Sequence, residues 1–171
     1  FIKDKNIEKK LSDDVHEMEK MLNEYLQFAS TRSNEKTEKF NMTDLIENII
    51  KKYENKNIIS KLSKDIQMNG RKNLIQRCLN NLIDNSIKYS NNINIYLAKS
   101  KNYLSVTIDD DGPGIAKEEY LNVFKPFYKI DKSRGETKSS VGLGMSIASD
   151  VVRSHGGNIV LDKSPQNGLR V

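Results

Sequence analysis

The first 29 residues carry apolar side chains in a repeating pattern of three and four. These positions are Ile7, Leu11, Val15, Met18, Leu22, Tyr25 and Ala29. The spacing predicts one long α-helix with its apolar side chains on one face and charged side chains on the others. A lone helix cannot bury such a seam, so we expect partner helices from upstream chain, from a second copy, or from both.

The pattern changes after residue 32. Residues 33–39 are polar and without periodicity, which indicates a linker, and residues 40–171 alternate between helical and strand patterns. Asn41 or Thr43 can cap a helix that runs to about Tyr53. Further helices are predicted over 73–89, 117–124 and 142–154. Strands are predicted over 58–62, 66–68, 93–98, 103–109 and 158–161, and from 168 to the last residue.

The segments between these elements predict the fold class. Asn69-Gly70 and residues 100–102 are turn signals, and residues 110–115 form a tight acidic glycine turn. Residues 125–141 have little periodicity and predict a long mobile loop, which in a compact domain is usually functional or disordered. Helices mixed with hairpin-type strands favour an α+β sandwich over a parallel sheet of βαβ units.

Composition and charge narrow the classes of function. Of 171 residues, 36% are hydrophobic and 30% charged, and no run of about 18 apolar residues could span a membrane. Cys78 is the single cysteine, which excludes an internal disulfide and a multi-cysteine metal site. The net charge is +5, but lysines alternate with glutamates, so we do not expect nucleic-acid binding. An acidic partner protein or a phosphorylated ligand remains compatible.

One stripe of the predicted helix 73–89 carries two amides and an ammonium. At about 100° per residue, Asn81, Asn85 and Lys88 lie within about 60° of one another. Oxygen ligands suit Mg²⁺ and lysine suits phosphate, so the stripe could hold a metal-bound polyphosphate. Taken alone, the stripe is better described as a solvated polar face, because charged and amide side chains normally face water.

Two glycine motifs follow this stripe in the chain. Residues 110–115 come directly after a strand, where Asp110 could accept from a purine amino group beside Ile115, or could belong to an ordinary surface turn. Gly142-Leu143-Gly144 opens a predicted helix, whose N-terminal N–H groups favour phosphate. The same two glycines could instead serve close helix packing.

The Asn-x-x-x-Asn helix, the Asp-x-Gly-x-Gly turn and the Gly-x-Gly helix start follow one another in a fixed order. In this order they resemble the motifs of the sensor histidine kinases of two-component systems, and among these they resemble the EnvZ-like kinases most. Residues 79–89 resemble the family's N box, 110–115 its G1 box, 124–129 its F box and 142–148 its G2 box. His155-Gly156-Gly157 is similar to a common segment after the last helix of the family. The resemblance covers the whole chain, because residues 22–29 resemble the second helix of the dimerisation domain.

The resemblance implies a fold, an activity and partners. The fold is a two-layer α/β sandwich of the gyrase, histidine-kinase and MutL ATP-binding type, preceded by a long helix of a dimeric bundle. Residues 1–32 are then part of the second dimerisation helix, and residues 40–171 the catalytic ATP-binding domain with a truncated C-terminal strand. The chain is expected to be a protein-histidine kinase that uses ATP and Mg²⁺. It would form a homodimer through its N-terminal helix and pass phosphate to a response-regulator receiver domain, and no nucleic acid is expected as a partner. The segment would be the cytoplasmic portion of an inner-membrane sensor, without direct membrane contact.

The resemblance also implies roles at the phosphate end of the nucleotide. Asn85 would ligate Mg²⁺, with Asn81 beside it as a possible second ligand. Lys88 would contact phosphate, and Lys129 would reach the transferred phosphate. Together Asn81, Lys88 and Lys129 are the expected catalytic residues.

At the base end, the resemblance places Asp110 on the adenine amino group and Tyr89 near the ring, with Ile115 close by. Gly112 and Gly114 would let the backbone close over the base.

In the lid of the nucleotide site, Gly142 and Gly144, with Leu143 between them, would form the hinge and offer N–H groups to the phosphates. Phe124 and Phe127 would anchor this lid to the core, or they are plain core residues.

The chain departs from the family pattern in three ways. Ser140-Val141 stands where the family commonly has Gly-Thr, and Lys129 replaces an arginine and gives up its bidentate fork. The phosphoacceptor histidine box is absent from this segment. His16 lacks the family's flanking residues and is not a substitute, whereas His155 is expected to be a capping or structural histidine.

Three alternatives remain open. An ATPase of the gyrase or mismatch-repair type has a glutamate four residues before the metal asparagine, where this chain has Asn81, an amide that cannot act as a base. A serine kinase that controls sigma factors would not need the apolar seam of residues 7–29. A nucleotide-binding scaffold without catalysis is compatible with Ser140, Val141 and Lys129.

Overall fold

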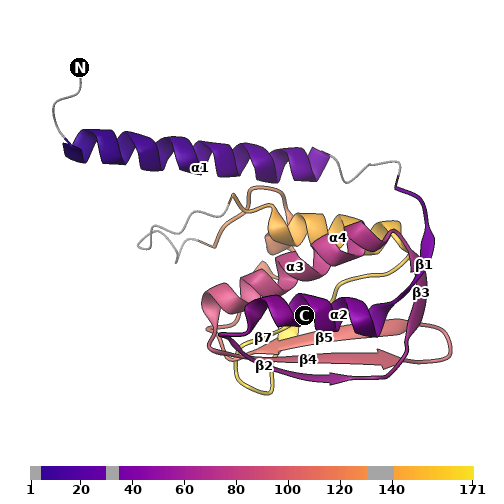
Figure 1. Cartoon of the computed structure of the whole chain (residues 1–171). Coiled ribbons are helices and arrows are strands. Elements are labelled where there is room, and N and C mark those ends of the chain that lie inside the picture. The colour runs from indigo at the N-terminus through magenta and orange to yellow at the C-terminus, as the bar shows by residue number, and fades with distance from the viewer. Residues whose placement is uncertain (1–4, 30–34, 131–140) are drawn as a thin grey trace.

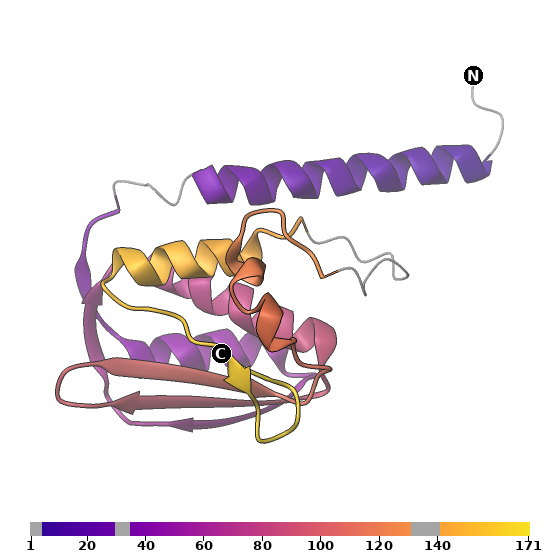
Figure 2. The ribbon, with the colours of Figure 1, turned by 180° about the vertical axis from the view of Figure 1, so that it is seen from behind.

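A helical layer covers one face of a β-sheet. The computed structural model describes residues 5–29, 35–130 and 141–171. Helices α2 (Met42–Ile50), α3 (Lys72–Tyr89) and α4 (Gly144–Ser154) lie together on one side of the sheet (Figure 1). The view from behind shows the same two layers, with α1 (Lys5–Ala29) beyond the helical layer (Figure 2).

The main sheet has five strands in the order β2-β4-β5-β7-β6. Their bounds are β2 Asn57–Leu62, β4 Asn92–Lys99, β5 Leu104–Asp110, β6 Asp162–Lys163 and β7 Leu169–Arg170. The β2–β4 pair is parallel, and the β4–β5, β5–β7 and β6–β7 pairs are antiparallel. A separate antiparallel pair joins β1 (Glu38–Asn41) to β3 (Gln67–Gly70). The predicted α+β sandwich is therefore confirmed.

The hydrophobic pattern explains how the two layers meet. In β4, the alternating residues Ile93, Ile95 and Leu97 are buried, while the residues between them point to the other face of the sheet. The helices contribute Ile46 of α2 and Ile83 of α3, both with 0% exposure. One continuous core thus lies between the sheet and the three helices.

The start of α2 shows which of the two predicted caps is used. The Asn41 side chain accepts from the Thr43 and Asp44 N–H groups at 2.9 and 3.4 Å, so Asn41 is the cap. Thr43 has another task. Its buried hydroxyl donates to the Ser63 carbonyl at 2.8 Å and accepts from the Ile66 N–H at 3.2 Å. These bonds fasten α2 to the segment between β2 and β3.

Two predicted elements are wrong because they depend on which strands pair with each other, and the local sequence pattern does not determine strand pairing. Asn69-Gly70 is not a turn but the end of β3, where it pairs with Lys39 and Glu38. The same pairing makes residues 38–39 part of a strand rather than of the linker. Residues 158–161 alternate in burial but form no strand, and the short strand comes later, at Asp162–Lys163. Within the described residues, β7 pairs only with that later segment and with β5.

Two predicted helices differ in their bounds. Residues 117–124 form two 3-10 turns, Lys117–Glu119 and Asn122–Phe124, instead of one α-helix. The Glu119 carboxylate accepts from the side chains of Asn122 and Tyr128, which holds the two turns together. Helix α4 begins at Gly144 rather than Gly142. The predicted loop 125–141 lies partly outside the described residues.

Helix α1 occupies the segment whose spacing predicted a long helix. The described apolar side chains along its seam are exposed, from 46% at Leu11 to 67% at Met18. No helix in the described part of the chain is long and apolar enough to cross a membrane.

We predict that Thr43→Val lowers the free energy of unfolding by about 1–3 kcal/mol, because two buried backbone groups lose their partner. Thr43→Ser keeps the hydroxyl and serves as the matched control, with a smaller loss. Urea unfolding of the three proteins measures the difference. Equal loss in both variants would show that the methyl group, not the hydroxyl, supports α2.

Candidate nucleotide site

The N-box helix and the G2-box helix meet at Asn81. A Cβ placed on Gly144, the first residue of α4, would lie 3.8 Å from Cβ, Cγ and Oδ1 of Asn81. The Asn81 Nδ2 is buried and has no hydrogen-bond partner within the described residues. Asn85 lies one turn further along α3 and is half-buried. The structure therefore brings Asn81 to the N-terminus of α4, with Asn85 on the next turn of α3.

The G1 box crosses the other end of α3. A Cβ on Gly112 would lie 2.9 Å from the Tyr89 carbonyl oxygen and 3.1 Å from Asp110 Oδ1, so only glycine fits without a shift. Lys88 and Tyr89 are exposed at this end, and the Lys88 Nζ lies 4.9 Å from the centre of the Tyr89 ring. This packing places the predicted phosphate-binding and base-binding residues next to one another.

Asp110 is the last residue of β5 and is only 5% exposed. Its Oδ1 accepts from the Gly112 N–H at 3.0 Å and from the Leu169 N–H at 2.9 Å. Two backbone donors on one oxygen fix the orientation of the carboxylate. Gly114, with φ of +67°, continues the turn and packs against the backbone of Gly168.

The sequence analysis missed the residues that hold Asp110 in place. A Cβ on Gly168 would collide with the backbone oxygen and Oδ1 of Asp110. Gly168 and the N–H of Leu169, which lies 59 residues after Asp110 in the chain, therefore pack behind the carboxylate. We call these two residues the wall behind Asp110. A glycine as the first residue of the last predicted strand was the only available signal.

The neighbouring carboxylate, Asp111, has a structural role. Its Oδ1 accepts from the Asn91 and Asn92 N–H groups at 2.8 and 2.9 Å, and its Oδ2 accepts from the Asn92 side chain. The hydrogen bonds from Asn92 and Asn91 hold the pKa of Asp111 below its ordinary value. Asp111 thus ties the G1 turn to the start of β4.

The two described segments that flank the predicted lid contact each other through their backbones, at residues 127–128 and at Gly142. Phe127 has φ of +67°, and its N–H donates to the Gly142 carbonyl at 3.0 Å. Gly142 has φ of +81°, and a Cβ there would lie 2.8 Å from the Tyr128 carbonyl oxygen, so a glycine is required. Ser140, the notable departure from the family pattern, lies outside the described residues.

The predicted anchoring of the lid needs a correction. The Phe127 side chain is 57% exposed, so it does not anchor the lid by burial, because the positive φ turns it outward. Leu143, with 0% exposure, is the buried anchor, and only its main chain is available to a ligand. Phe124 and Ile115 are half-buried.

Lys129 lies two residues before the undescribed segment 131–140 and is exposed. No hydrogen bond or ion pair joins it to α3 within residues 35–130 and 141–171. The role of Lys129 at the transferred phosphate therefore stays a prediction.

The residues present fit a nucleotide with a divalent cation. The described ranges contain no group of three His, Cys, Asp or Glu that could hold a metal. Amide oxygens of Asn81 and Asn85, with phosphate oxygens, are then the natural ligands for Mg²⁺. The buried amide of Asn81 without a partner and the N-terminal N–H groups of α4 can bind phosphate oxygens.

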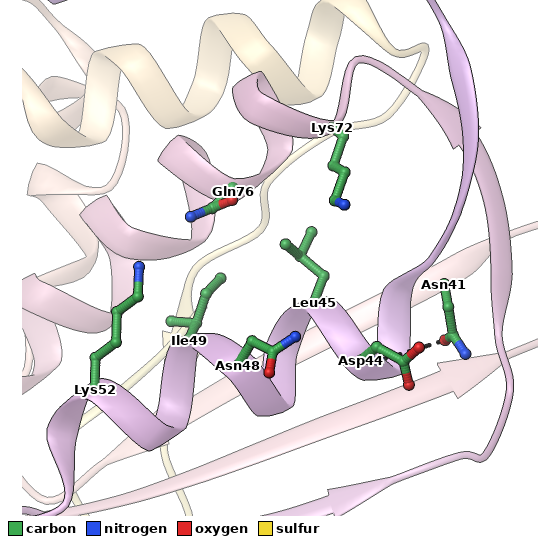
Figure 3. A pocket seen from close by; sticks show the side chains of 8 residues that line it. All are labelled: Asn41, Asp44, Leu45, Asn48, Ile49, Lys52, Lys72 and Gln76. Carbon is green, nitrogen blue, oxygen red and sulfur yellow. Dashed lines mark hydrogen bonds between the residues drawn. The ribbon is translucent and has the colours of Figure 1, made fainter.

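Two pockets lie away from the candidate site residues. One, of about 210 Å³, lies between α2 and α3, with Leu45 and Ile49 at its floor and Lys52, Lys72 and Gln76 around it (Figure 3). The other, of about 350 Å³, is lined by residues of β2 and β4 with Asp111 and Gln166. Neither is lined by Asn81, Asn85 or Asp110.

Comparisons with known proteins find histidine kinases similar to this chain in sequence and in fold. The sensor histidine kinase CpxA of Escherichia coli is 34% identical over 103 residues, which cover 60% of this chain and 22% of CpxA. Among solved structures, the histidine kinase AdeS of Acinetobacter baumannii has a TM-score of 0.72 at 22% identity, covering 99% of this chain and 83% of AdeS. Full-length ShkA in complex with AMPPNP has a TM-score of 0.73 at 17% identity, covering 86% of this chain and 33% of ShkA.

The chain spans about a fifth of the length of CpxA. The model of the histidine kinase-, DNA gyrase B- and HSP90-like ATPases matches residues 70–171, which hold α3, β4, β5, α4 and every predicted site residue. The chain therefore belongs to this ATPase family.

Proposed function

We propose that this chain is the catalytic region of a sensor histidine kinase, which binds Mg-ATP and transfers the γ-phosphate to a histidine. The observations that carry the proposal are the meeting of Asn81 with the N-terminus of α4 and the fixed carboxylate of Asp110 at the end of β5. The AMPPNP complex of ShkA, a protein of similar fold, supports a nucleotide as the ligand.

In this proposal, each residue of the site has a physical task. Asp110 accepts a hydrogen bond from the purine amino group, since its carboxylate is held rigidly at the end of β5. Asn85, with Asn81, ligates Mg²⁺, which would neutralise charge on the transferring phosphate. Lys88 and the N–H groups at the start of α4 bind phosphate oxygens, and Lys129 supplies a further cation near the lid.

Asn81 favours transfer to a protein side chain over hydrolysis. An ATPase must activate water with a base, and an amide cannot accept a proton at neutral pH. In this chain Asn81 faces Gly144 from the position where the hydrolases have a glutamate. A nucleotide-binding scaffold without catalysis remains the second candidate, because Lys129 stands where the family usually has an arginine.

We infer that the acceptor histidine lies on a dimerisation helix that packs against α1. The exposed apolar seam of α1, including Leu11, Val15 and Leu22, supports a helical bundle, and a second copy would complete it. The phosphate would then pass to a response-regulator receiver domain. We further propose that the region is the cytoplasmic part of an inner-membrane sensor.

We predict that the chain binds ATP, with higher affinity when Mg²⁺ is present. Asp110→Ala should weaken ATP binding at least tenfold with or without Mg²⁺, because the base loses its acceptor. Asn85→Ala should remove most of the effect of Mg²⁺ and leave metal-free binding unchanged. Isothermal titration calorimetry measures both. Variants that bind like the parent chain would show that the site is elsewhere.

Gly168→Ala should weaken ATP binding about as much as Asp110→Ala, because the added methyl group collides with the Asp110 carboxylate. Gly156→Ala is the control: a Cβ there meets nothing within 4 Å, so the added methyl group brings only the backbone strain of its φ of +78°, which lowers stability and should leave ATP affinity unchanged. Circular dichroism checks that both variants fold. Unchanged affinity in a folded Gly168→Ala protein would contradict the role of this wall.

Transfer of phosphate from ATP to a histidine distinguishes a kinase from a non-catalytic scaffold and from an ATPase. Labelled ATP, supplied with a separate histidine-bearing dimerisation domain from a related kinase, should yield acid-labile phosphate on that domain. Lys129→Ala should slow transfer about tenfold at unchanged ATP affinity, and Lys129→Arg should not. ATP binding without transfer would support the scaffold, and release of inorganic phosphate without labelled acceptor would support an ATPase.

A further inference from the structure

The N-terminus of α3 is not capped by its own sequence. Arg71 occupies the N-cap position, and its side chain makes no capping hydrogen bond. The first N–H groups of a helix need acceptors from elsewhere. Two distant side chains supply them: Glu35 Oε1 accepts from the Asn73 N–H at 2.8 Å, and His155 Nε2 accepts from the Arg71 N–H at 3.1 Å.

The same contacts fasten the start of α3 to the end of α4. His155 is the C-cap residue of α4, and its Nδ1 lies 2.8 Å from the Val151 carbonyl oxygen, so Nδ1 carries the proton and Nε2 accepts. The Arg71 guanidinium donates to the Ser154 carbonyl at 3.1 Å and to its hydroxyl at 2.6 Å. We call Glu35, Arg71, Ser154 and His155 the capping cluster.

Glu35 differs from the other members because it comes before the nucleotide-binding domain. It lies in the described segment between α1 and β1, which enters the domain at the side where α3 begins and α4 ends (Figure 1). Its charge also acts on Arg77 one turn along α3: burial lowers the pKa of that guanidinium, and the Glu35 carboxylate opposes the shift. A carboxylate at this position also complements the helix dipole.

We propose that Glu35 is a positioning residue for the metal–phosphate half of the nucleotide site. Asn81 lies eight residues beyond Asn73, about 12 Å along the helix axis. It faces Gly144, at the end of α4 opposite to the capping cluster. Without the carboxylate, the Asn73 N–H has no acceptor and the first turn of α3 frays where it is fastened to α4.

The base-binding carboxylate does not lie on this helix, and α3 approaches the base only through its last residue, Tyr89, at the end opposite to Asn73. Asp110 lies on β5 and is held by the Gly112 and Leu169 N–H groups. Loss of Glu35 therefore weakens binding of the metal-bound phosphates and spares binding of the base. In this way the segment after α1 sets the affinity for Mg-ATP. The inference rests on the proposed function.

The experiment compares Mg-ATP with adenosine as ligands of the full chain. Glu35→Ala should raise the Kd for Mg-ATP about three- to tenfold, change the Kd for adenosine less than twofold, and speed hydrogen exchange at the Asn73 amide. Glu35→Gln keeps an oxygen acceptor without the charge and should restore part of the affinity. Glu38→Ala, which removes an exposed glutamate of β1, is the matched control and should change nothing.

The outcomes separate the inference from the proposed function. An equal loss of affinity for Mg-ATP and adenosine would mean that Glu35 acts only on overall stability, and would overturn the proposal. Faster exchange at Asn73 with unchanged Mg-ATP affinity would overturn it as well. A parent chain that binds neither ligand would refute the proposed function first, before any variant is compared.

Discussion

The packing of α3 against α4 is the contact on which the nucleotide site depends. Ile75 and Cys78 of α3 and Ala148 and Val151 of α4 are buried in one core, and the Cys78 thiol lies 3.7 Å from the Ala148 carbonyl oxygen. Burial raises the pKa of this thiol to about 12, so it behaves as a small apolar group. Because the two helices run in opposite directions, this contact brings the middle of one to the N-terminus of the other.

The base end of the site is built on different principles. There the sheet, rather than a helix, supplies the carboxylate that we propose binds the base, and backbone amides from two separate segments orient it. Glycines at 112 and 168 are needed because other chain atoms occupy the space of a side chain. The rigid base end and the helix-borne phosphate end can therefore respond differently to changes elsewhere in the chain.

The ends of α3 connect the site to its surroundings. The C-terminal end lies under the G1 turn, and the N-terminal end receives acceptors from the segment after α1 and from the end of α4. Since the helix has no cap of its own, its first turn is stabilised only when those other segments are in place. The start of α3 thus depends on hydrogen-bond acceptors that lie 38 and 84 residues away in the chain.

The sequence by itself determined the periodic elements and the order of the motifs. The alternation of β4, the helical stripe with Asn81 and Asn85, and the glycines of the G1 and G2 boxes are local patterns, and the structure has them where they were expected. Only the tertiary structure decided the pairing of β1 with β3, the wall of Gly168 and Leu169 behind Asp110, the outward turn of Phe127, and the capping by Glu35 and His155. Pairings such as these join residues that are distant in the chain, so no local periodicity or spacing contains them.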